Sequence, residues 1–325
     1  MDKKPSIVFM GTPDFAVASL EAIHQAGYEI KAVVTVPDRQ TGRGLKITIS
    51  PVKEYALQHN LPLLQPEKLR DETFLNTLRS LNADLFVVVA FRMLPRAVWA
   101  MPPLGTFNLH ASLLPDYRGA APINWAIING ETESGVTTFM LNERIDEGEI
   151  LLQEKTAISP ADNAETLHDR LMEIGKDLVL KTIEGIADDT IAPHQQPTTA
   201  APKNAPKIFK DDCRIDWNKP GTEIVNFIRG LSPYPAAYME LEYPDGHIVP
   251  FKIFDACFEK GDSKGDLAII TDQKKHLKIA VNGGFIEINK LQMSGKRCLS
   301  TENFLIGNNV TSCILVDKKK PWKNL

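Results

Sequence analysis

The sequence predicts an α/β protein with a doubly wound, mostly parallel sheet in its first domain and a small β-barrel in its second. Three observations support this prediction. Strand-like apolar runs alternate with amphipathic helical stretches over the first half, a Pro-, Thr- and Ala-rich stretch follows, and short strands with Gly and Asp turns fill the remainder. The length of 325 residues fits two domains of roughly 150 residues each.

The first half contains the elements of repeated βα units. SIVFMG (6–11) is a short apolar run ended by glycine, which is typical of a strand buried on both faces of a parallel sheet. ADLFVVVA (83–90) is the clearest strand because it is apolar and rich in β-branched residues. The other elements that we expect are helices at 15–27, 52–59 and 163–186, the last capped by Asn163, and strands at 30–36, in LPLLQ, at 105–111 and at 135–141.

The composition changes near residue 187. The stretch ADDTIAPHQQPTTAAPKNAPK has no hydrophobic period and predicts an interdomain linker over 187–206. The predicted domains are therefore 1–186 and 207–325. In the second domain we expect strands in AAYMELEY, HIVPFKIFDACFE, GDLAIIT, HLKIAVNG and GFIEINKLQM.

The overall composition is that of an ordinary soluble protein, with 43% hydrophobic and 24% charged residues. No apolar stretch approaches the ~20 residues needed to cross a bilayer, and the first residues lack the pattern of a signal peptide. We therefore expect a cytoplasmic location. The four cysteines are far apart and form no CxxC pair, so neither a disulfide framework nor a metal site is predicted.

Two polar residues interrupt the apolar pattern at the end of one strand, in NLHASLLPDYRGAAP (108–122). Asn108 and His110 are two residues apart, so both side chains point to one face of the strand. They lie at the carboxyl edge of the predicted sheet, where open α/β sheets bind ligands. An amide and an imidazole can together stabilise an oxyanion. The alternative is a pair of structural polar residues held by hydrogen bonds.

Two further stretches carry candidate residues. LNERIDEGEIL (141–151) places Asp146 in a turn beside Gly148, where an acid is often merely solvated. PDRQTGRGLKITISPVK (37–53) is an unusually long, basic connection that carries Arg39, Arg43, Lys46 and Lys53, and its charges suit either phosphate binding or simple solvation. GTPDFAV follows the first strand without a GxGxxG pattern, which disfavours a nucleotide cofactor.

Taken in order, these stretches resemble the methionyl-tRNA formyltransferase family. The resemblance rests on GTPDFAV, PDRQTGRG…SPVK, ADLFVVVA, FNLHASLLPDYRGAAPI and GVTTFMLNERIDEGEIL, and RIDW and PYPAAY extend it into the second domain. It covers nearly the whole chain. It implies a formyltransferase-type Rossmann domain followed by an OB-like barrel. It also implies transfer of the formyl group of 10-formyltetrahydrofolate to the amino group of methionyl initiator tRNA.

The resemblance also implies roles for single residues. The expected catalytic residues are Asn108, His110 and Asp146, without a metal. The folate site would be formed by Ser112, Leu113, Leu114, Pro115 and Phe91. The tRNA would be bound by the C-terminal domain and by Arg39, Arg43, Lys46, Lys207 and Lys210. We expect the chain to act as a monomer.

One stretch departs from the family pattern, and other functions remain as alternatives. The turn Phe91–Pro95 is one residue shorter than the turn that helps to form the family's folate pocket. Glycinamide ribonucleotide and sugar-nucleotide formyltransferases share the Asn-His-Asp arrangement but lack the basic loop joined to an OB-like domain. A formyltetrahydrofolate hydrolase module is normally part of a longer chain. A non-catalytic RNA-binding module would not need the three polar residues.

Overall fold

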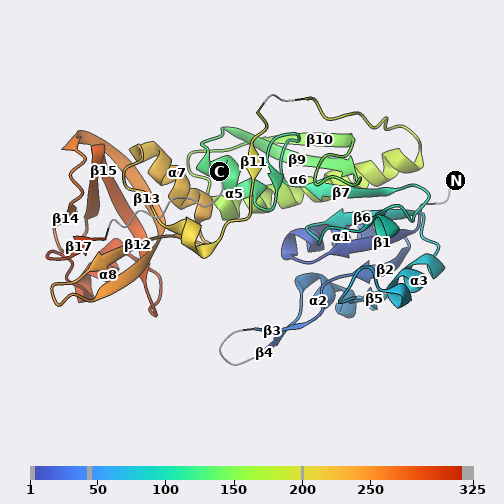
Figure 1. Cartoon of the computed structure of the whole chain (residues 1–325), viewed down its shortest axis with the longest axis horizontal. Helices are drawn as coiled ribbons and strands as arrows, with labels where there is room; N and C mark the ends of the chain where they lie inside the picture. Colours follow the sequence, from blue (N-terminus) through green and yellow to red (C-terminus); the bar gives the residue numbers. More distant parts are fainter. Residues whose placement is uncertain (1–3, 42–45, 199–200, 317–325) are drawn as a thin grey trace. The chain divides into compact units, whose positions relative to one another are not determined.

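The computed structural model of the chain describes residues 4–41, 46–198 and 201–316. The chain divides into two compact units, and each contains more than one segment. The first unit comprises Met1–Pro122, Glu133–Ala157 and His168–Asn204, and the second comprises Ile123–Thr132, Ile158–Leu167 and Ala205–Leu325. Figure 1 colours the ribbon from the N-terminus (blue) to the C-terminus (red) and labels most of the elements.

The first unit is built on a seven-stranded sheet with the strand order β10-β9-β7-β6-β1-β2-β5. The five strands from β7 to β5 are parallel. β9 pairs antiparallel with β7, and the edge strand β10 pairs antiparallel with β9. The mostly parallel α/β sheet predicted from the sequence is thus confirmed. The strands are β1 (Ile7–Gly11), β2 (Ile30–Val34), β5 (Leu63–Leu64), β6 (Leu85–Val89), β7 (Thr106–His110), β9 (Glu133–Met140) and β10 (Ile150–Ala157).

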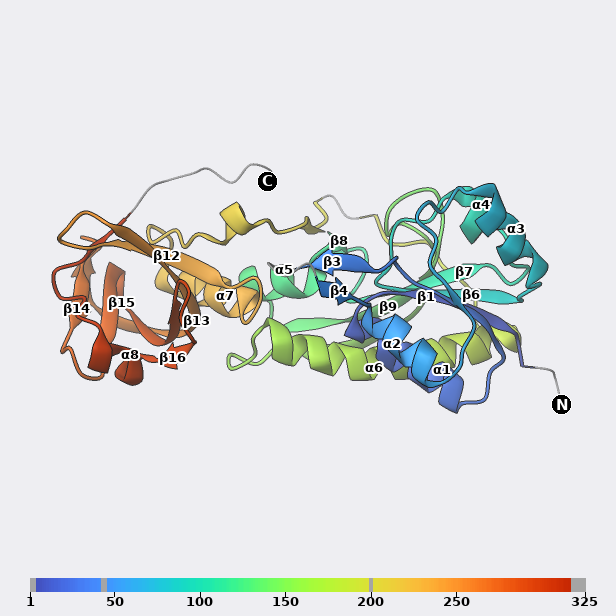
Figure 2. The same cartoon turned by 90° about the horizontal axis from the view of Figure 1, so that it is seen from below.

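Helices cover both faces of this sheet, as Figure 2 shows. On one face, α3 (Glu72–Ser80) and α4 (Arg96–Trp99) pack on alternate residues of β1, β2 and β6. On the other face lie α1 (Asp14–Gln25), α2 (Pro51–Gln58) and α6 (Ala164–Ala187). α6 approaches β7 closely, because a Cβ on Gly175 would meet Leu109 Cδ2 at 2.8 Å. Leu109 therefore faces α6, and its neighbours Asn108 and His110 face the opposite side.

The second unit is built on an antiparallel sheet with the strand order β14-β15-β13-β12-β17, and β16 pairs with β15. A single apolar core joins this sheet to the helices of the unit. The elements are β12 (Ala237–Glu242), β13 (Ile248–Lys264), β14 (Ile269–Thr271), β15 (Leu277–Met293), β16 (Leu299–Ser300), β17 (Ile314–Leu315), α7 (Gly221–Leu231) and α8 (Thr301–Gly307).

The remaining elements are short. β3 (Arg39–Thr41) and β4 (Lys46–Thr48) form an antiparallel pair in the basic connection, and β8 (Arg118–Gly119) pairs with β11 (Asn204–Ala205). The other short elements are the helix α5 (Pro122–Ile128) and the 3-10 helix η1 (Lys210–Cys213). In the described parts of the chain, no helix is both long and apolar enough to cross a membrane.

Two details of the sequence prediction were wrong. HLKIAVNG and GFIEINKLQM form the single strand β15, because the chain continues in the sheet through Gly283 and Gly284. A side chain at Gly284 would meet the Glu259 carbonyl oxygen at 2.1 Å, so the glycine that suggested a turn allows two backbones to approach. The helices α3, α4, α7 and α8 and the edge strand β10 were not predicted.

Candidate active site

Strand β7 places Asn108 and His110 at the carboxyl end of the sheet, on the face shared with Val88 of the neighbouring β6. The Asn108 side chain is half-buried, and its amide has no hydrogen-bond partner among the described residues. A buried amide is usually paired within the protein. The Asn108 amide is therefore available to a ligand.

His110 is held in one orientation by the loop that follows β7. The residue is only 7% exposed, and its Nε2 lies 2.9 Å from the carbonyl oxygen of Tyr117. A carbonyl only accepts, so Nε2 carries the hydrogen and donates it to Tyr117. Nδ1 faces Asp146 Oδ2 at 3.9 Å, which is too long for a hydrogen bond. Nδ1 is thus the ring atom that can exchange a proton with a bound molecule.

Asp146 lies in a turn of unusual backbone geometry. Its φ is +54°, in the left-handed region that aspartate and asparagine tolerate better than most residues. The Gly119 N–H donates to Asp146 Oδ2 at 2.9 Å, and this bond fixes the carboxylate on the side of His110. Two residues further, a Cβ on Gly148 would lie 1.6 Å from the Met140 carbonyl oxygen, so only glycine fits there. The structure thus brings His110 and Asp146 together across the loops that follow β7 and β9.

The residues predicted for the folate site differ in exposure. Ser112 and Leu114 are buried, and Ser112 Oγ donates to the Asp116 carbonyl oxygen at 2.7 Å. Leu113 and Pro115 are half-buried. Phe91 is also half-buried and packs partly on the apolar core below α3 and α4. Of the five residues predicted for the folate site, Leu113, Pro115 and Phe91 are the ones whose side chains are accessible to a ligand.

Two polar residues that the sequence analysis missed, Thr137 and Gln153, hold residues 112–114 of the predicted folate site in place. Thr137 Oγ1 donates to the Ser112 carbonyl oxygen at 2.6 Å and accepts from the Leu114 N–H at 3.1 Å. Gln153 Nε2 donates to the Leu114 carbonyl oxygen at 3.0 Å. Both lie on the antiparallel strands β9 and β10, so their proximity to residues 112–114 follows from strand pairing and carries no local sequence signal.

The basic residues predicted to bind tRNA lie on the surface where they are described. Arg39 is exposed at the start of β3, and Lys207 and Lys210 are exposed beside Phe209. Lys53 differs from the other basic residues of its connection, because its Nζ pairs with Asp38 Oδ2 at 2.6 Å. Arg43 and the Lys46 side chain lie outside the described residues.

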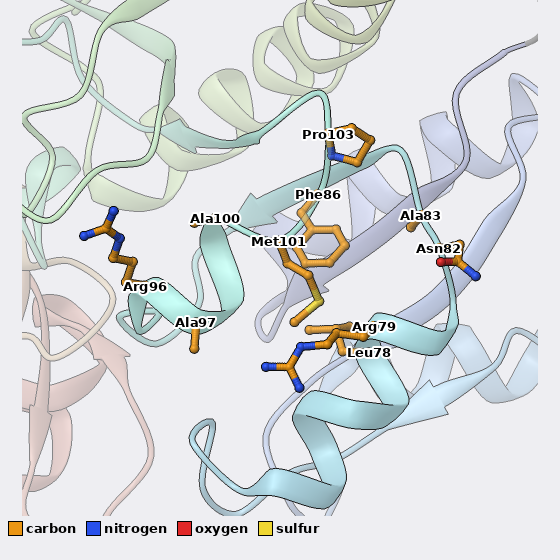
Figure 3. Close-up of a pocket in the computed structure, with 10 residues that line it drawn as sticks. All are labelled: Leu78, Arg79, Asn82, Ala83, Phe86, Arg96, Ala97, Ala100, Met101 and Pro103. Carbon is orange, nitrogen blue, oxygen red and sulfur yellow. The ribbon is translucent and has the colours of Figure 1, made fainter.

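Cavities lined by described residues of the first unit include the following two. One of about 710 Å³ lies between α3 and α4, at the amino end of β6 and therefore away from Asn108 at the carboxyl end of β7 (Figure 3). Its residues are Leu78, Arg79, Asn82, Ala83, Phe86, Arg96, Ala97, Ala100, Met101 and Pro103. The other, of about 600 Å³, lies beside the Asp146 turn, and its lining includes residues 142–144, 147, 195–198 and 202.

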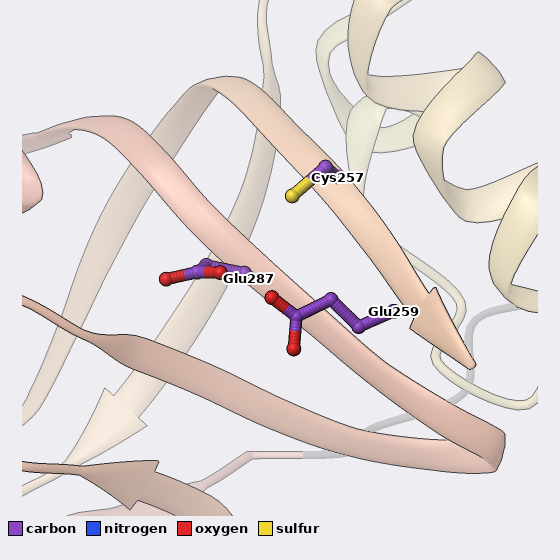
Figure 4. A group of neighbouring side chains, drawn as sticks. All are labelled: Cys257, Glu259 and Glu287. Atoms are coloured by element: carbon purple, nitrogen blue, oxygen red, sulfur yellow. The ribbon is translucent and has the colours of Figure 1, made fainter. Parts of the chain in front are cut away.

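In the second unit, the candidate ligand atoms of Cys257, Glu259 and Glu287 all lie within 4.8 Å of one another (Figure 4). These carboxylates already have cationic partners. Lys278 Nζ lies 2.6 Å from Glu259 and 3.7 Å from Glu287. The hydrogen bond from Lys278 holds the pKa of Glu259 below its usual value. We interpret these residues as ion pairs on the surface of the sheet, and not as a metal site.

The fold and this site define a formyltransferase, and the comparison with known proteins identifies the family. The chain belongs to the formyl transferase family, which matches residues 4–183, and the C-terminal domain of the same family matches residues 207–309.

Relatives of high identity share one activity. The methionyl-tRNA formyltransferase of Bacteroides thetaiotaomicron is 54% identical over 93% of this chain and 95% of its own length. That of Flavobacterium johnsoniae is 50% identical over 94% of this chain and 96% of its own length. The crystal structure of WlaRD, a sugar 3N-formyl transferase, covers 91% of this chain and 100% of its own at 22% identity, with a TM-score of 0.62. The last comparison supports the fold alone.

Proposed function

We propose that this enzyme transfers the formyl group of 10-formyltetrahydrofolate to the amino group of methionyl initiator tRNA. The observation that carries the proposal is the Asn108 amide, which has no partner among the described residues, on the same strand as His110 of the His110–Asp146 pair. It occurs in a chain that is 54% identical to a methionyl-tRNA formyltransferase over 93% of its length. The enzyme would act as a cytoplasmic monomer.

Formyl transfer needs oxyanion stabilisation and two proton movements. The amino nitrogen attacks the formyl carbon, a C–N bond forms, and the carbonyl oxygen becomes an oxyanion. The bond from this carbon to folate N10 then breaks, N10 gains a proton, and the former amine loses one. An α-amino group has a reference pKa of about 7.7–8.0, so much of it is neutral near pH 8 and its activation is the smaller problem.

The three polar side chains divide this work. The Asn108 amide donates to the developing oxyanion, since none of the described residues competes for its N–H. His110 Nε2–H is occupied by the Tyr117 carbonyl, so His110 acts through Nδ1, from which the protonated ring donates the proton that folate N10 gains. Asp146, 3.9 Å from that atom, stabilises the protonated ring and accepts the proton of the attacking amine, directly or through water.

The binding surfaces follow from exposure and charge. The half-buried Leu113, Pro115 and Phe91 would contact the folate. The side chains of Ser112 and Leu114 are buried and fix the backbone of this stretch. The protein carries a net charge of −4, so it needs local basic groups to bind tRNA. Arg39, Arg43 and Lys46 in the long connection and Lys207 and Lys210 after the linker would supply them.

The proposal is tested by offering 10-formyltetrahydrofolate labelled in the formyl group with one acceptor at a time. The acceptors are methionyl initiator tRNA, glycinamide ribonucleotide, a dTDP-amino sugar and water. We expect label transfer to the tRNA alone. Transfer to a nucleotide acceptor, or release as formate at a comparable rate, would replace the proposed function by another formyl transfer reaction or by hydrolysis.

The basic connection is tested by two substitutions. Arg43→Ala is expected to lower kcat/KM strongly for initiator methionyl-tRNA and to reduce the preference over the elongator tRNA, because an arginine between two glycines can approach unpaired bases. Lys46→Ala should weaken both tRNAs evenly and reduce the slope of log kcat/KM against log salt by about 1. Lys53→Ala is the control, since Lys53 is paired with Asp38. Unchanged kcat/KM and preference in Arg43→Ala would exclude this connection from recognition.

A further inference from the structure

We infer that the described residues of the segment from His194 to Lys203 (194–198 and 201–203), which the sequence predicts to belong to an interdomain linker, position the catalytic groups, and that Gln196 is the principal positioning residue. The inference rests on the proposed function for the roles of His110 and Asp146. Its structural basis is a set of hydrogen bonds within the first unit, which link this segment to both residues.

Gln196 closes the turn that carries Asp146. Its Nε2 donates to the carbonyl oxygen of Asp146 at 2.8 Å and to that of Gly148 at 2.9 Å. Both hydrogens of the amide are thus used, one on each side of the turn. These bonds brace the backbone on which Asp146 has its left-handed conformation.

The orientation of the Gln196 amide is fixed by Arg118. Gln196 Oε1 accepts from Arg118 Nε at 3.2 Å and from Nη2 at 2.5 Å. Arg118 Nη1 also pairs with Glu147 Oε1 at 3.2 Å. A guanidinium only donates and a carbonyl only accepts, so the amide oxygen must face Arg118 and the NH₂ group must face the turn.

Backbone bonds hold the segment on either side of Gln196. His194 and Ile150 exchange two hydrogen bonds, of 2.8 and 3.0 Å, at the start of β10, which sets the register that delivers Gln196 to the turn. At the other end, the Lys203 carbonyl oxygen accepts from the Tyr117 N–H at 2.5 Å. Tyr117 is the residue whose carbonyl binds His110 Nε2. The described residues of this segment therefore support both the turn of Asp146 and Tyr117, the residue that orients His110.

This arrangement bears on catalysis because the His110–Asp146 separation is set by loops. Loss of the Gln196 amide leaves the carbonyls of Asp146 and Gly148 without these donors and lets the turn move. A displacement of about 1 Å in a catalytic group can cost about 10²-fold in rate. Gln196 does not need to touch the substrate to have this effect, since it acts through Asp146.

The test compares three full-length variants. Gln196→Ala removes the amide, and Gln196→Glu keeps its size and its acceptor toward Arg118 but cannot donate to the two carbonyls when ionised. Gln195→Ala is the matched control, because the exposed Gln195 side chain pairs with the half-buried Glu149 and, among the described residues, makes no bond to the carbonyls of the Asp146 turn. We expect both Gln196 variants to lower kcat by about 10- to 100-fold with little change in KM for either substrate, and Gln195→Ala to retain wild-type kcat.

Two measurements separate positioning from a general loss of structure. In an Asp146→Ala background, Gln196→Ala should have almost no further effect on kcat, because both changes remove one function. Hydrogen exchange at the Gly119 amide, which donates to Asp146 Oδ2, should accelerate in the Gln196 variants and not in Gln195→Ala.

Wild-type kcat in Gln196→Glu, additive losses with Asp146→Ala, or unchanged exchange at Gly119 would each overturn the inference. Wild-type enzyme that transfers no formyl group to methionyl-tRNA would overturn the proposed function instead. The exchange at Gly119 would still decide whether Gln196 positions Asp146.

Discussion

His110→Ala is expected to lower kcat for formyl transfer to initiator methionyl-tRNA by about 10²–10³-fold. This is the usual cost of removing one side chain that stabilises a developing oxyanion or transfers a proton in the transition state. The buried ring is fixed through the bond from Nε2 to the Tyr117 carbonyl and presents Nδ1 toward Asp146. Alanine removes that nitrogen. Steady-state kinetics at saturating folate and tRNA measure the loss.

The control for this prediction is His247→Ala. His247 is also paired with an aspartate, Asp245, but this pair is exposed on a turn of the second unit. Circular dichroism and the melting temperature should show both variants folded. If His110→Ala retained near-normal kcat, the chemistry assigned to the loop after β7 would be wrong.

Asn108→Ala is expected to cost a similar factor for a different reason. The Asn108 amide has no protein partner among the described residues, so its removal leaves no orphaned group and should not destabilise the fold. A large loss of kcat with an unchanged melting temperature would therefore report the donor alone.

How far the sequence predicts this protein depends on whether the signal is local. The strands β1 and β6 were predicted because continuous apolar runs mark strands buried on both faces. Asn108 and His110 were predicted to share a face because strand geometry alternates side chains. Asn163 was predicted to cap α6, and its Oδ1 accepts from the Thr166 N–H at 2.9 Å.

The rest depends on contacts between distant segments. Asp146 is a turn acid of an ordinary kind in the sequence, and only the resemblance to a family suggested that it meets His110. Gln196 carried no signal, because its amide donates to backbone carbonyls, which every residue has, and its side-chain partner Arg118 is 78 residues away in the sequence. Thr137 and Gln153 were missed for the same reason. The antiparallel pairing of β9 with β7 and β10 creates the contacts of Thr137 and Gln153. The direction in which a strand pairs cannot be predicted from the residues of that strand alone.

Asp146→Asn is expected to lower kcat by about 10²–10⁴-fold while leaving the fold and the substrate KM values nearly unchanged. In the catalytic triad of serine proteases, the same change of the aspartate that orients the histidine lowers kcat by about 10⁴-fold. Asparagine accepts the left-handed backbone at φ +54°, and its side-chain oxygen can still accept the Gly119 N–H. The substitution therefore removes the negative charge, and the turn keeps its shape. An amide neither stabilises a protonated His110 nor accepts a proton from the amine.

Asp146→Ala and Asp245→Asn complete this experiment. Asp146→Ala also loses the bond to Gly119 and places alanine at a positive φ, so it should lower the melting temperature as well as kcat. Asp245→Asn changes the exposed pair with His247 and should leave kcat unaltered. If Asp146→Asn retained most of its kcat while Asp146→Ala did not, the carboxylate would serve to hold the Gly119 loop. Its charge would then have no part in the reaction, and the proton of the attacking amine would have to leave through His110 Nδ1 or water.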